Sequence, residues 1–145
     1  MIKLAREKGL RVEDVMTTSL VVLDVRMTVD VAAGILAERR ISGAPVVSAA
    51  GKPVGIVSRA DLLDPRHRVP GASVESAMTR MLYAVRPTDP ATTAIRLMVA
   101  ENIHRVVAVD THGALVGIVT SMDVMRAIVG SESGAGDIEY IKLGS

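Results

Sequence analysis

The chain contains no cysteine, no phenylalanine and no tryptophan, and it has only two tyrosines. Without cysteine it can form neither a disulfide nor a thiolate metal site, and a thiol nucleophile is excluded. Without Phe or Trp, a core must be built from Val, Ala, Ile, Leu and Met, and β-branched residues favour sheets. The lack of cysteine fits a reducing cytosol, and since the sequence also shows no membrane span and no secretory signal pattern, we expect a cytoplasmic location.

The chain also lacks an excess of charge of one sign and long apolar runs. It has 17 basic and 16 acidic residues and a net charge of +1, so we expect neither nucleic acid nor an anionic membrane surface as a partner. Apolar runs such as residues 20–23 and 106–109 are far shorter than the roughly 18 residues that cross a bilayer. A chain of 145 residues can bury a core of its own, and we expect one globular body.

The sequence repeats itself at an offset of 62 residues, the difference between positions 74 and 12. The shift superposes matching parts of two copies: residues 12–17 on 74–79, residues 54–57 on 116–119, and Asp61 on Asp123. A register that holds without a gap over about fifty residues indicates duplicated supersecondary units.

In each copy, the spacing of the apolar residues predicts a strand, a helix, a hairpin and a second helix, in that order. The runs 20–23 and 82–85 predict strands, and apolar residues at a 3.6-residue spacing predict a helix after each. Asp89 followed by Pro90 is typical of an N-cap and a first helical residue. The later elements are predicted once in each copy: hairpin strands 44–47 and 53–58 with helix 59–63, and hairpin strands 106–109 and 115–120 with helix 121–129.

We therefore predict an α/β (α+β) fold of two β-α-β-β-α units related by a pseudo-twofold axis. Neither copy can bury its apolar face alone, so we expect the two to pack through their sheets, close a common core and leave two clefts between them. The predicted divisions follow in order: an N-terminal segment 1–11, a first repeat 12–64, a linker 65–73, a second repeat 74–130, and a flexible tail 131–145, in which 138–143 is either a short docking strand or without a role.

Each hairpin ends in a hydroxyl that is followed three residues later by an acid, Ser58 with Asp61 and Thr120 with Asp123. In a structural interpretation, the two side chains form a capping box at the start of a helix. In a functional interpretation, the carboxylates accept hydrogen bonds from ribose hydroxyls, and the hydroxyls bind a phosphate or sugar oxygen near the helix start. The two interpretations are compatible.

The complete pattern resembles a tandem pair of CBS domains, a Bateman module, over residues 10–130. The resemblance rests on three pairs of segments: residues 15–17 with 77–79, residues 41–47 with 103–109, and the Gly-x-x-Ser/Thr-x-x-Asp ends 55–61 with 117–123. It implies a regulatory module that binds an adenosine nucleotide, AMP, ADP or ATP, in clefts between the repeats, with no cofactor required. It also implies that two copies associate through their helices into a homodimer.

The resemblance also implies which residues bind the nucleotide, because each cleft combines one repeat's hydroxyl and acid with the other repeat's loop and strand. The first cleft is expected to contain Ser58, Asp61, Tyr83, His104 and Arg105. The second is expected to contain Val21, Ser42, Gly43, Ala44, Pro45, Thr120 and Asp123. The guanidinium of Arg105 matches phosphate oxygens, so we expect phosphate to favour the first cleft. The small residues of the second cleft leave room for a base or ribose.

The chain departs from the family pattern in two ways. The first repeat has no basic residue at the position equivalent to Arg105. Tyr83 is the only aromatic candidate for stacking on adenine, so we expect Val and Ile to enclose the base. His104 has the alternative role of capping a strand at the surface. The basic clusters at Arg39, Arg40 and 66–68 are interpreted as exposed faces, with phosphate contacts or partner-binding patches as the alternatives.

Three functions are open from the sequence. The favoured one is a ligand-sensing module, in which nucleotide occupancy changes the angle between the repeats. The second is a structural dimerisation module whose pockets bind nothing. The third is an enzyme, which we do not expect, because no Ser-His-Asp set, carboxylate pair or metal cluster stands out, and His104 and His112 have no third ligand nearby.

Overall fold

The computed structural model describes residues 2–80 and 83–130. A short helix, α1 (Ile2–Glu7), precedes two halves that have the same order of elements. The first half consists of α2 (Val12–Val15), β1 (Leu23–Asp24), α3 (Val29–Arg39), β2 (Gly43–Val47), β3 (Pro53–Ser58) and α4 (Arg59–Leu63). The second half consists of α5 (Val74–Ala77), β4 (Ala84–Val85), α6 (Ala91–Ala100), β5 (Arg105–Val109), β6 (Leu115–Thr120) and α7 (Ser121–Gly130). The predicted β-α-β-β-α order is confirmed, and each half also begins with one helical turn.

Each half contains a three-stranded sheet, ordered β1-β2-β3 in the first half and β4-β5-β6 in the second. The first pair of strands in each sheet is parallel, with a helix as the crossover, and the second pair is an antiparallel hairpin. The hairpin turns use Gly51 at φ +77° and Gly113 at φ +78°, a conformation that glycine adopts without a steric penalty. Turn chemistry is therefore repeated along with the strands.

The first strand of each half is shorter than predicted. β1 forms only a two-residue ladder, Leu23 with Val46 and Asp24 with Val47, so residues 20–22 of the predicted strand lie outside it. β4 likewise covers only Ala84–Val85, and Leu82 lies outside the described residues. These strands pair on one edge only, and residues 20 and 21 turn away to line a cleft between the halves.

The predicted N-cap at Asp89 is wrong, because α6 begins at Ala91 and its N-cap is Pro90, whose side chain makes no capping hydrogen bond. The Asp89 carboxylate instead accepts a hydrogen bond from the backbone N–H of Arg86 at 2.8 Å. Its backbone carbonyl accepts from the N–H of Val12 at 2.8 Å. Asp89 therefore closes the turn between β4 and α6 and ties that turn to α2.

The segments that lead into each half cross over and complete the sheet of the other half. Thr17 bridges to Ile118 in β6 through two backbone hydrogen bonds of 2.9 and 3.0 Å. Thr79 bridges in the same way to Ile56 in β3, with bonds of 2.8 and 3.0 Å. The two halves are thus tied together by an exchange of short segments, residues 12–17 and 74–79.

Two glycines make room for these crossing segments. A Cβ atom on Gly117 would lie 2.6 Å from the Sδ atom of Met16, and a Cβ on Gly55 would lie 2.6 Å from the Sδ atom of Met78. Real Cβ atoms do not approach sulfur so closely, so both positions require glycine or a shift of the crossing segment. The repeated Val-Gly-Ile-Val run has its glycine where the partner segment passes over the strand.

The buried residues form two clusters, so the expectation of one common core is wrong. One cluster packs β4–β6, α6 and α7 against Val12 and Val15 of α2 and Ala5 of α1. The other packs β1–β3, α3 and α4 against Val74 and Ala77 of α5. Each core therefore includes a short segment of the other half, and the two cores stay separate clusters. Each fully buried valine or leucine contributes roughly 1.5–3 kcal/mol relative to leaving it exposed.

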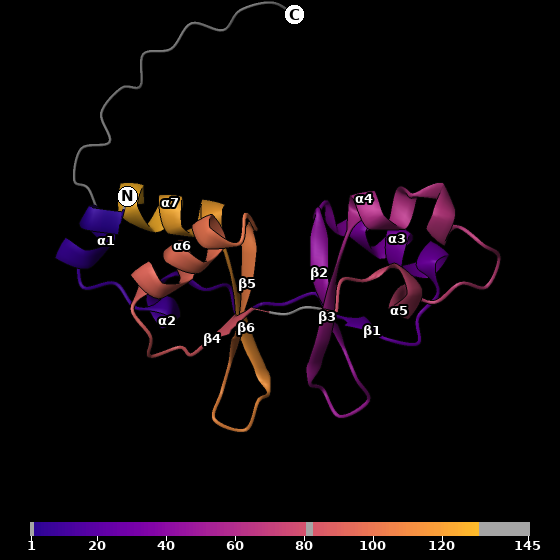
Figure 1. Cartoon of the computed structure of the whole chain (residues 1–145), viewed down its shortest axis with the longest axis horizontal. Helices are drawn as coiled ribbons and strands as arrows, with labels where there is room; N and C mark the ends of the chain where they lie inside the picture. Colours follow the sequence, from indigo (N-terminus) through magenta and orange to yellow (C-terminus); the bar gives the residue numbers. More distant parts are fainter. Residues whose placement is uncertain (1, 81–82, 131–145) are drawn as a thin grey trace, which may run out of the picture.

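The two sheets face each other at the centre of the molecule, and the helices lie on their outer sides (Figure 1). This arrangement confirms the predicted α+β fold of two similar units packed through their sheets. The predicted linker 65–73 begins with a 3₁₀ turn, η1 (Pro65–His67), and ends at Ser73, which bridges to Thr28. The predicted tail 131–145, with segment 138–143, lies outside the described residues, and the division into domains stays a prediction.

Among the described residues, no helix has the length and apolar character needed to cross a bilayer.

Candidate functional site

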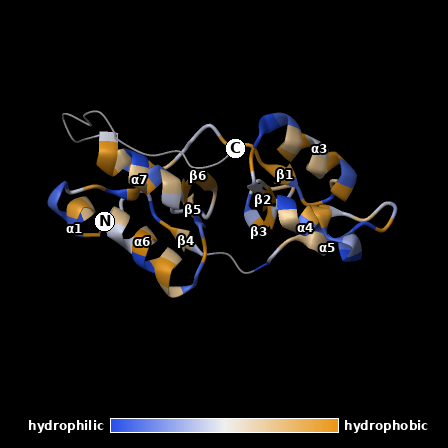
Figure 2. Cartoon of the chain, turned by 90° about the horizontal axis from the view of Figure 1, so that it is seen from above, coloured by the Kyte–Doolittle hydropathy of each residue, from blue (hydrophilic) through white to orange (hydrophobic). Residues whose placement is uncertain are grey.

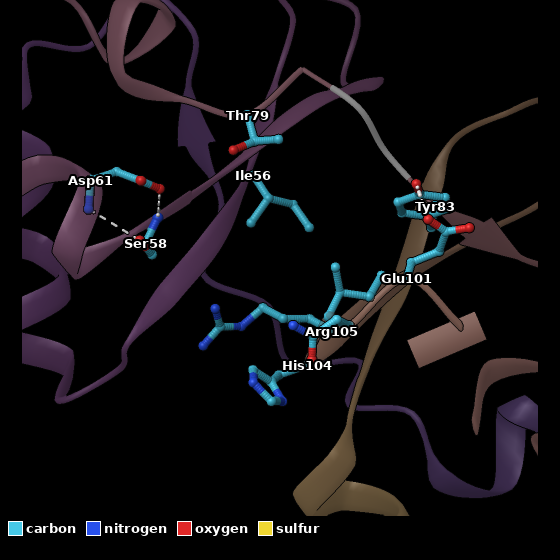
Figure 3. A pocket seen from close by; sticks show the side chains of 10 residues that line it. Ile56, Ser58, Asp61, Thr79, Tyr83, Glu101, His104 and Arg105 are labelled. Atoms are coloured by element: carbon cyan, nitrogen blue, oxygen red, sulfur yellow. Dashed lines mark hydrogen bonds between the residues drawn. The ribbon is translucent and has the colours of Figure 1, made fainter. Parts of the chain in front are cut away.

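The first cleft is a cavity of about 450 Å³ between the halves. Its walls include the five residues that the sequence assigns to it: Ser58, Asp61, Tyr83, His104 and Arg105. Figure 3 shows Ser58 and Asp61 of the first half at one side of the cavity and Tyr83 of the second half at the other. The remaining lining residues are not assigned by the sequence: Ile56, Thr79, Glu101, Asn102 and Ile103.

The hydroxyl and acid of each half form the predicted capping box. Ser58 Oγ accepts from the N–H of Asp61 at 3.1 Å, and the Asp61 carboxylate accepts from the N–H of Ser58 at 2.9 Å. Thr120 and Asp123 repeat both contacts, at 3.1 and 2.9 Å. The structural interpretation is confirmed, and each pair also lines a cleft between the halves. One carboxylate oxygen, Oδ2, makes the capping contact in each case.

The far wall of the first cleft carries an acidic group that the sequence does not single out. The hydroxyl of Tyr83 donates to the Glu101 carboxylate at 2.8 Å (Figure 3). This hydrogen bond is the main reason that the pKa of Tyr83 is raised above its usual value, since it holds the proton on the phenol. The cleft therefore has a carboxylate on either side, Asp61 and Glu101, and Ile56 lies between them (Figure 3), while Ile103 adds a second apolar side chain to the lining.

The second cleft has a volume of about 360 Å³ and repeats the plan of the first with the halves exchanged. It contains six of the seven residues that the sequence assigns to it: Val21, Ser42, Gly43, Pro45, Thr120 and Asp123. The seventh, Ala44, is 1% exposed and belongs to the core of the first half. Side chains alternate along a strand, so Ala44 faces the opposite side of β2 from its neighbours Gly43 and Pro45.

Two further arginines, Arg40 and Arg126, line the second cleft. The sequence predicts an exposed face for Arg40 and gives no role to Arg126. Arg40, the last residue after α3, adopts a left-handed conformation with φ +56° that turns the chain into the cleft loop. Arg126 extends from α7, and its guanidinium lies 3.8 Å from the Asp123 carboxylate. Thr17 Oγ1 donates to the same carboxylate at 3.4 Å. Arg40 therefore belongs to a cleft rather than to a face that only meets solvent.

Arg105 belongs to both clefts. It begins β5 beside the first cleft, and its guanidinium extends away from Tyr83 and donates to the hydroxyl of Ser42 in the second (Figure 3). A Cβ atom on Gly43 would lie 2.7 Å from Nη1 of Arg105, so the glycine makes room for the guanidinium. Burial lowers the pKa of Arg105 from its usual value, because desolvation disfavours the charged form.

The position of Arg105 between the clefts removes the reason to expect that phosphate favours the first cleft. The sequence predicts that basic side chains distinguish the first cleft, yet Arg40, Arg105 and Arg126 all line the second, beside Asp123 alone among the acids. The signal for Arg40 is present in the repeat, where it falls on Asn102, which has the same left-handed backbone at φ +52° and lines the first cleft. Arg126 falls on Asp64, which lines neither of the two clefts described, so the repeat gives no signal for it.

Residues 2–80 and 83–130 contain no group of three or more His, Asp or Glu side chains arranged to hold a metal ion.

Comparisons with known proteins agree with this plan of two halves. The model of the CBS domain family matches residues 12–67 and again 74–130. The structure of CBSX2 in complex with AMP superposes with a TM-score of 0.77 at 32% identity, over 84% of this chain and 98% of that one. The CBS domain pair of protein MJ0100 in complex with 5′-methylthioadenosine and S-adenosyl-L-methionine gives 0.75 at 28% identity, over 85% and 98%.

Among curated proteins, the A-adding tRNA nucleotidyltransferase of Aquifex aeolicus is 33% identical over 119 residues. The match covers 82% of this chain but only 14% of that protein. The similarity therefore concerns one part of a much longer protein. Two successive matches to one family model, each with its own three-stranded sheet and its own share of both clefts, show that the chain belongs to the CBS domain family and carries two CBS domains in tandem.

Proposed function

We propose that the chain is a regulatory module that binds adenosine compounds, with AMP, ADP or ATP as candidate ligands, in the two clefts between its CBS domains. The observation that carries the proposal is the composite wall of each cleft, in which a hydroxyl and an acid of one half face a loop and strand of the other. Ligand bound there contacts both halves, so its affinity depends on how the halves are placed. The two CBS-pair structures described above, with AMP and with adenosyl compounds, support this ligand class.

The first cleft has suitable groups for a nucleoside. Asp61 uses Oδ2 for the capping contact, so Oδ1 is available to accept hydrogen bonds from the ribose hydroxyls. Ile56 and Ile103 offer apolar walls for the base, and Tyr83 offers an aromatic edge. A volume of about 450 Å³ lies within the range of roughly 300–1,000 Å³ that is typical of small-molecule sites.

The test compares three alanine variants by calorimetric titration with AMP and ATP. Asp61→Ala and Asp123→Ala are each expected to weaken binding at their own cleft by about ten- to a hundredfold, because hydrogen bonds to charged groups contribute about 1.5–3 kcal/mol. Asp14→Ala is the matched control, since Asp14 makes the same kind of capping contact to the N–H of Arg11 at 2.8 Å on α2, outside the two clefts described. It should lose about 1 kcal/mol of stability and no affinity.

Unchanged affinity in both cleft variants would contradict the proposal. The alternative is a structural dimerisation module whose clefts bind nothing. A thermal melt separates the two functions, because a ligand at a hundred times its Kd stabilises the native state by about 2.7 kcal/mol. If AMP, ADP and ATP all leave the melting temperature unchanged, the alternative holds.

Association of two copies through the helical side is part of the same proposal. The helices of this side carry exposed apolar side chains, Leu63 on α4 and Met125 and Val129 on α7. Figure 1 places both helices on one side of the molecule, and Figure 2, which looks onto that side, colours much of α7 as hydrophobic. Met side chains adapt to irregular apolar contacts. The expectations of a cytoplasmic location, and of a role in regulation rather than catalysis, also stay predictions of this proposal.

A further inference from the structure

The guanidinium of Arg105 is a single cation between two cavities. The residue lines the first cleft with Ser58 and Asp61 and the second cleft with Thr120 and Asp123. Its Nη2 atom donates to Ser42, whose backbone carbonyl in turn accepts from the N–H of Arg59 at 2.8 Å, at the start of α4. Arg105 therefore reaches across the interface from the second half to a loop that is fixed in the first.

The repeat supplies no second arginine that could substitute for Arg105. The equivalent residue of the first half is Gly43, and a side chain there would collide with Nη1 of Arg105 and with the backbone oxygen of Val57, at 2.7 and 2.9 Å from a Cβ. The interface has room for one such side chain. Any anion in either cleft that needs this guanidinium has to share it with the other cleft.

In the structure, where Arg105 is hydrogen-bonded to Ser42, the two clefts differ strongly in charge. The first cleft then keeps two carboxylates, Asp61 and Glu101, and the imidazole of His104. The second has Arg40 and Arg126 against the single carboxylate of Asp123, in addition to Arg105. Phosphate is therefore attracted to the second cleft, and the first is suited to an adenosine compound without phosphate.

We propose that Arg105 couples the two clefts. A phosphate-bearing ligand in the second cleft holds the guanidinium there and lowers the affinity of the first cleft for another phosphate-bearing ligand, while the affinity for an uncharged adenosine compound stays unchanged. This inference rests on the proposed function and assigns each cleft its ligand class. The physical reason is that phosphate in the first cleft must draw Arg105 away from Ser42, or else face Asp61 and Glu101 with only the imidazole of His104 beside them.

The experiment measures the affinity of the first cleft with the second cleft filled or disabled, using AMP and adenosine as probes. In the unchanged protein, titration with AMP reports the second binding step after the second cleft is filled. Asp123→Ala disables the second cleft, and there the first cleft is expected to bind AMP at least about fivefold more tightly than it does in that second step, within the range of typical coupling energies. Adenosine is expected to bind the first cleft equally well in both cases.

Two further variants assign the coupling to Arg105. In Arg105→Gln, adding Asp123→Ala should no longer change the AMP affinity of the first cleft. Arg126→Gln is the matched control, because Arg126 lines the second cleft only and its loss should weaken AMP there and leave the coupling in place. Since Asp123 also caps α7, Arg40→Glu provides a second way to disable the second cleft, at an exposed side chain.

Equal AMP affinity of the first cleft with the second filled and disabled would overturn the coupling while leaving the proposed function intact. Coupling that persists in Arg105→Gln would overturn the role of Arg105. Absence of binding by AMP and by adenosine would overturn the proposed function itself, and the coupling with it.

Discussion

Helix α4 ends after five residues at Leu63, whereas α7, which starts at the equivalent position of the second half, continues for ten residues. The repeat explains the difference, because Pro65 of the first half falls on Ala127 of the second. Proline lacks the N–H that a continuing helix needs and disfavours helical geometry in the residue before it, here Asp64. The difference at this one repeat position, Pro65 against Ala127, therefore explains why α4 ends and why α7 continues.

This extension changes both the cleft and the surface of the second half. Arg126 of α7 lines the second cleft, while its equivalent Asp64 starts the linker. The added turns also carry Val129 onto the exposed apolar side. The frame of the two halves, with its capping boxes and its glycines under the crossing segments, is nearly the same. Two halves with the same frame therefore present different chemistry, because the residues beyond the frame differ.

We expect the largest loss of stability from alanine at the two glycines under the crossing segments, and the loss should differ between the halves. Gly55→Ala places a Cβ 2.8 Å from the carbonyl oxygen of Thr79, a backbone atom that can move only if the crossing segment 74–79 moves with it. For Gly117→Ala, the three nearest atoms all belong to the flexible side chain of Met16. Overpacking typically costs about 1–3 kcal/mol, and we expect Gly55→Ala near the upper end and Gly117→Ala near the lower. Urea denaturation measures both.

Double variants sharpen this test. Met16→Ala removes the two nearest atoms that Gly117→Ala meets, Sδ and Cγ, and leaves only the Cβ of residue 16 at 3.2 Å, so the two changes together should cost less than the sum of the single changes. Met78→Ala should relieve Gly55→Ala only in part, because the Thr79 carbonyl stays in place. Equal rescue in the two halves would show that the crossing segments are equally mobile and would contradict the predicted difference.

An intermediate effect is expected at the exposed helices. Met125→Glu places a charge in the middle of the apolar side of α7 and should weaken self-association at least about tenfold, because an unpaired charge is costly to bury in an interface. Leu63→Glu at the equivalent position of the shorter α4 should have a smaller effect, since fewer apolar residues surround it. Light scattering over a concentration series measures both variants, and a protein that is monomeric before mutation would refute the proposed association.

The smallest effect concerns Asp64, the residue that replaces Arg126 in the first half. Hydrogen bonds from the side chain and backbone N–H of Arg66 lower the pKa of the Asp64 carboxyl from 3.8 to about 2. A lowered pKa means that the contribution to stability is fully present above pH 3.8 and is lost as the pH falls through about 2. Both side chains meet solvent, so the effect is small.

Carboxyl chemical shifts during an acid titration report the pKa of Asp64, and Arg66→Gln should return it toward 3.8. A midpoint near 3.8 in the unchanged protein would contradict the predicted ion pair. Arg126→Gln is the control from the other half and should leave the Asp64 titration as it was.

The sequence predicts the elements that repeat and misses what depends on contacts between copies. The capping acids Asp61 and Asp123 are predicted because hydroxyl, acid and strand end lie within one short motif. Glu101 and Arg126 are missed because neither has an equivalent of the same type in the other copy. The single common core is predicted wrongly for a related reason: hydrophobic period does not reveal that residues 12–17 and 74–79 exchange partners.

That exchange has a consequence for how the chain can be divided. A ribosome has to synthesise Thr79 before the first sheet is complete, although the other strands of that sheet are finished by Ser58. Cutting the chain within 65–73 would give two fragments that each retain the segment needed by the other. Such fragments should be poorly folded alone and should recover native structure when they are mixed, in the manner of domain-swapped proteins.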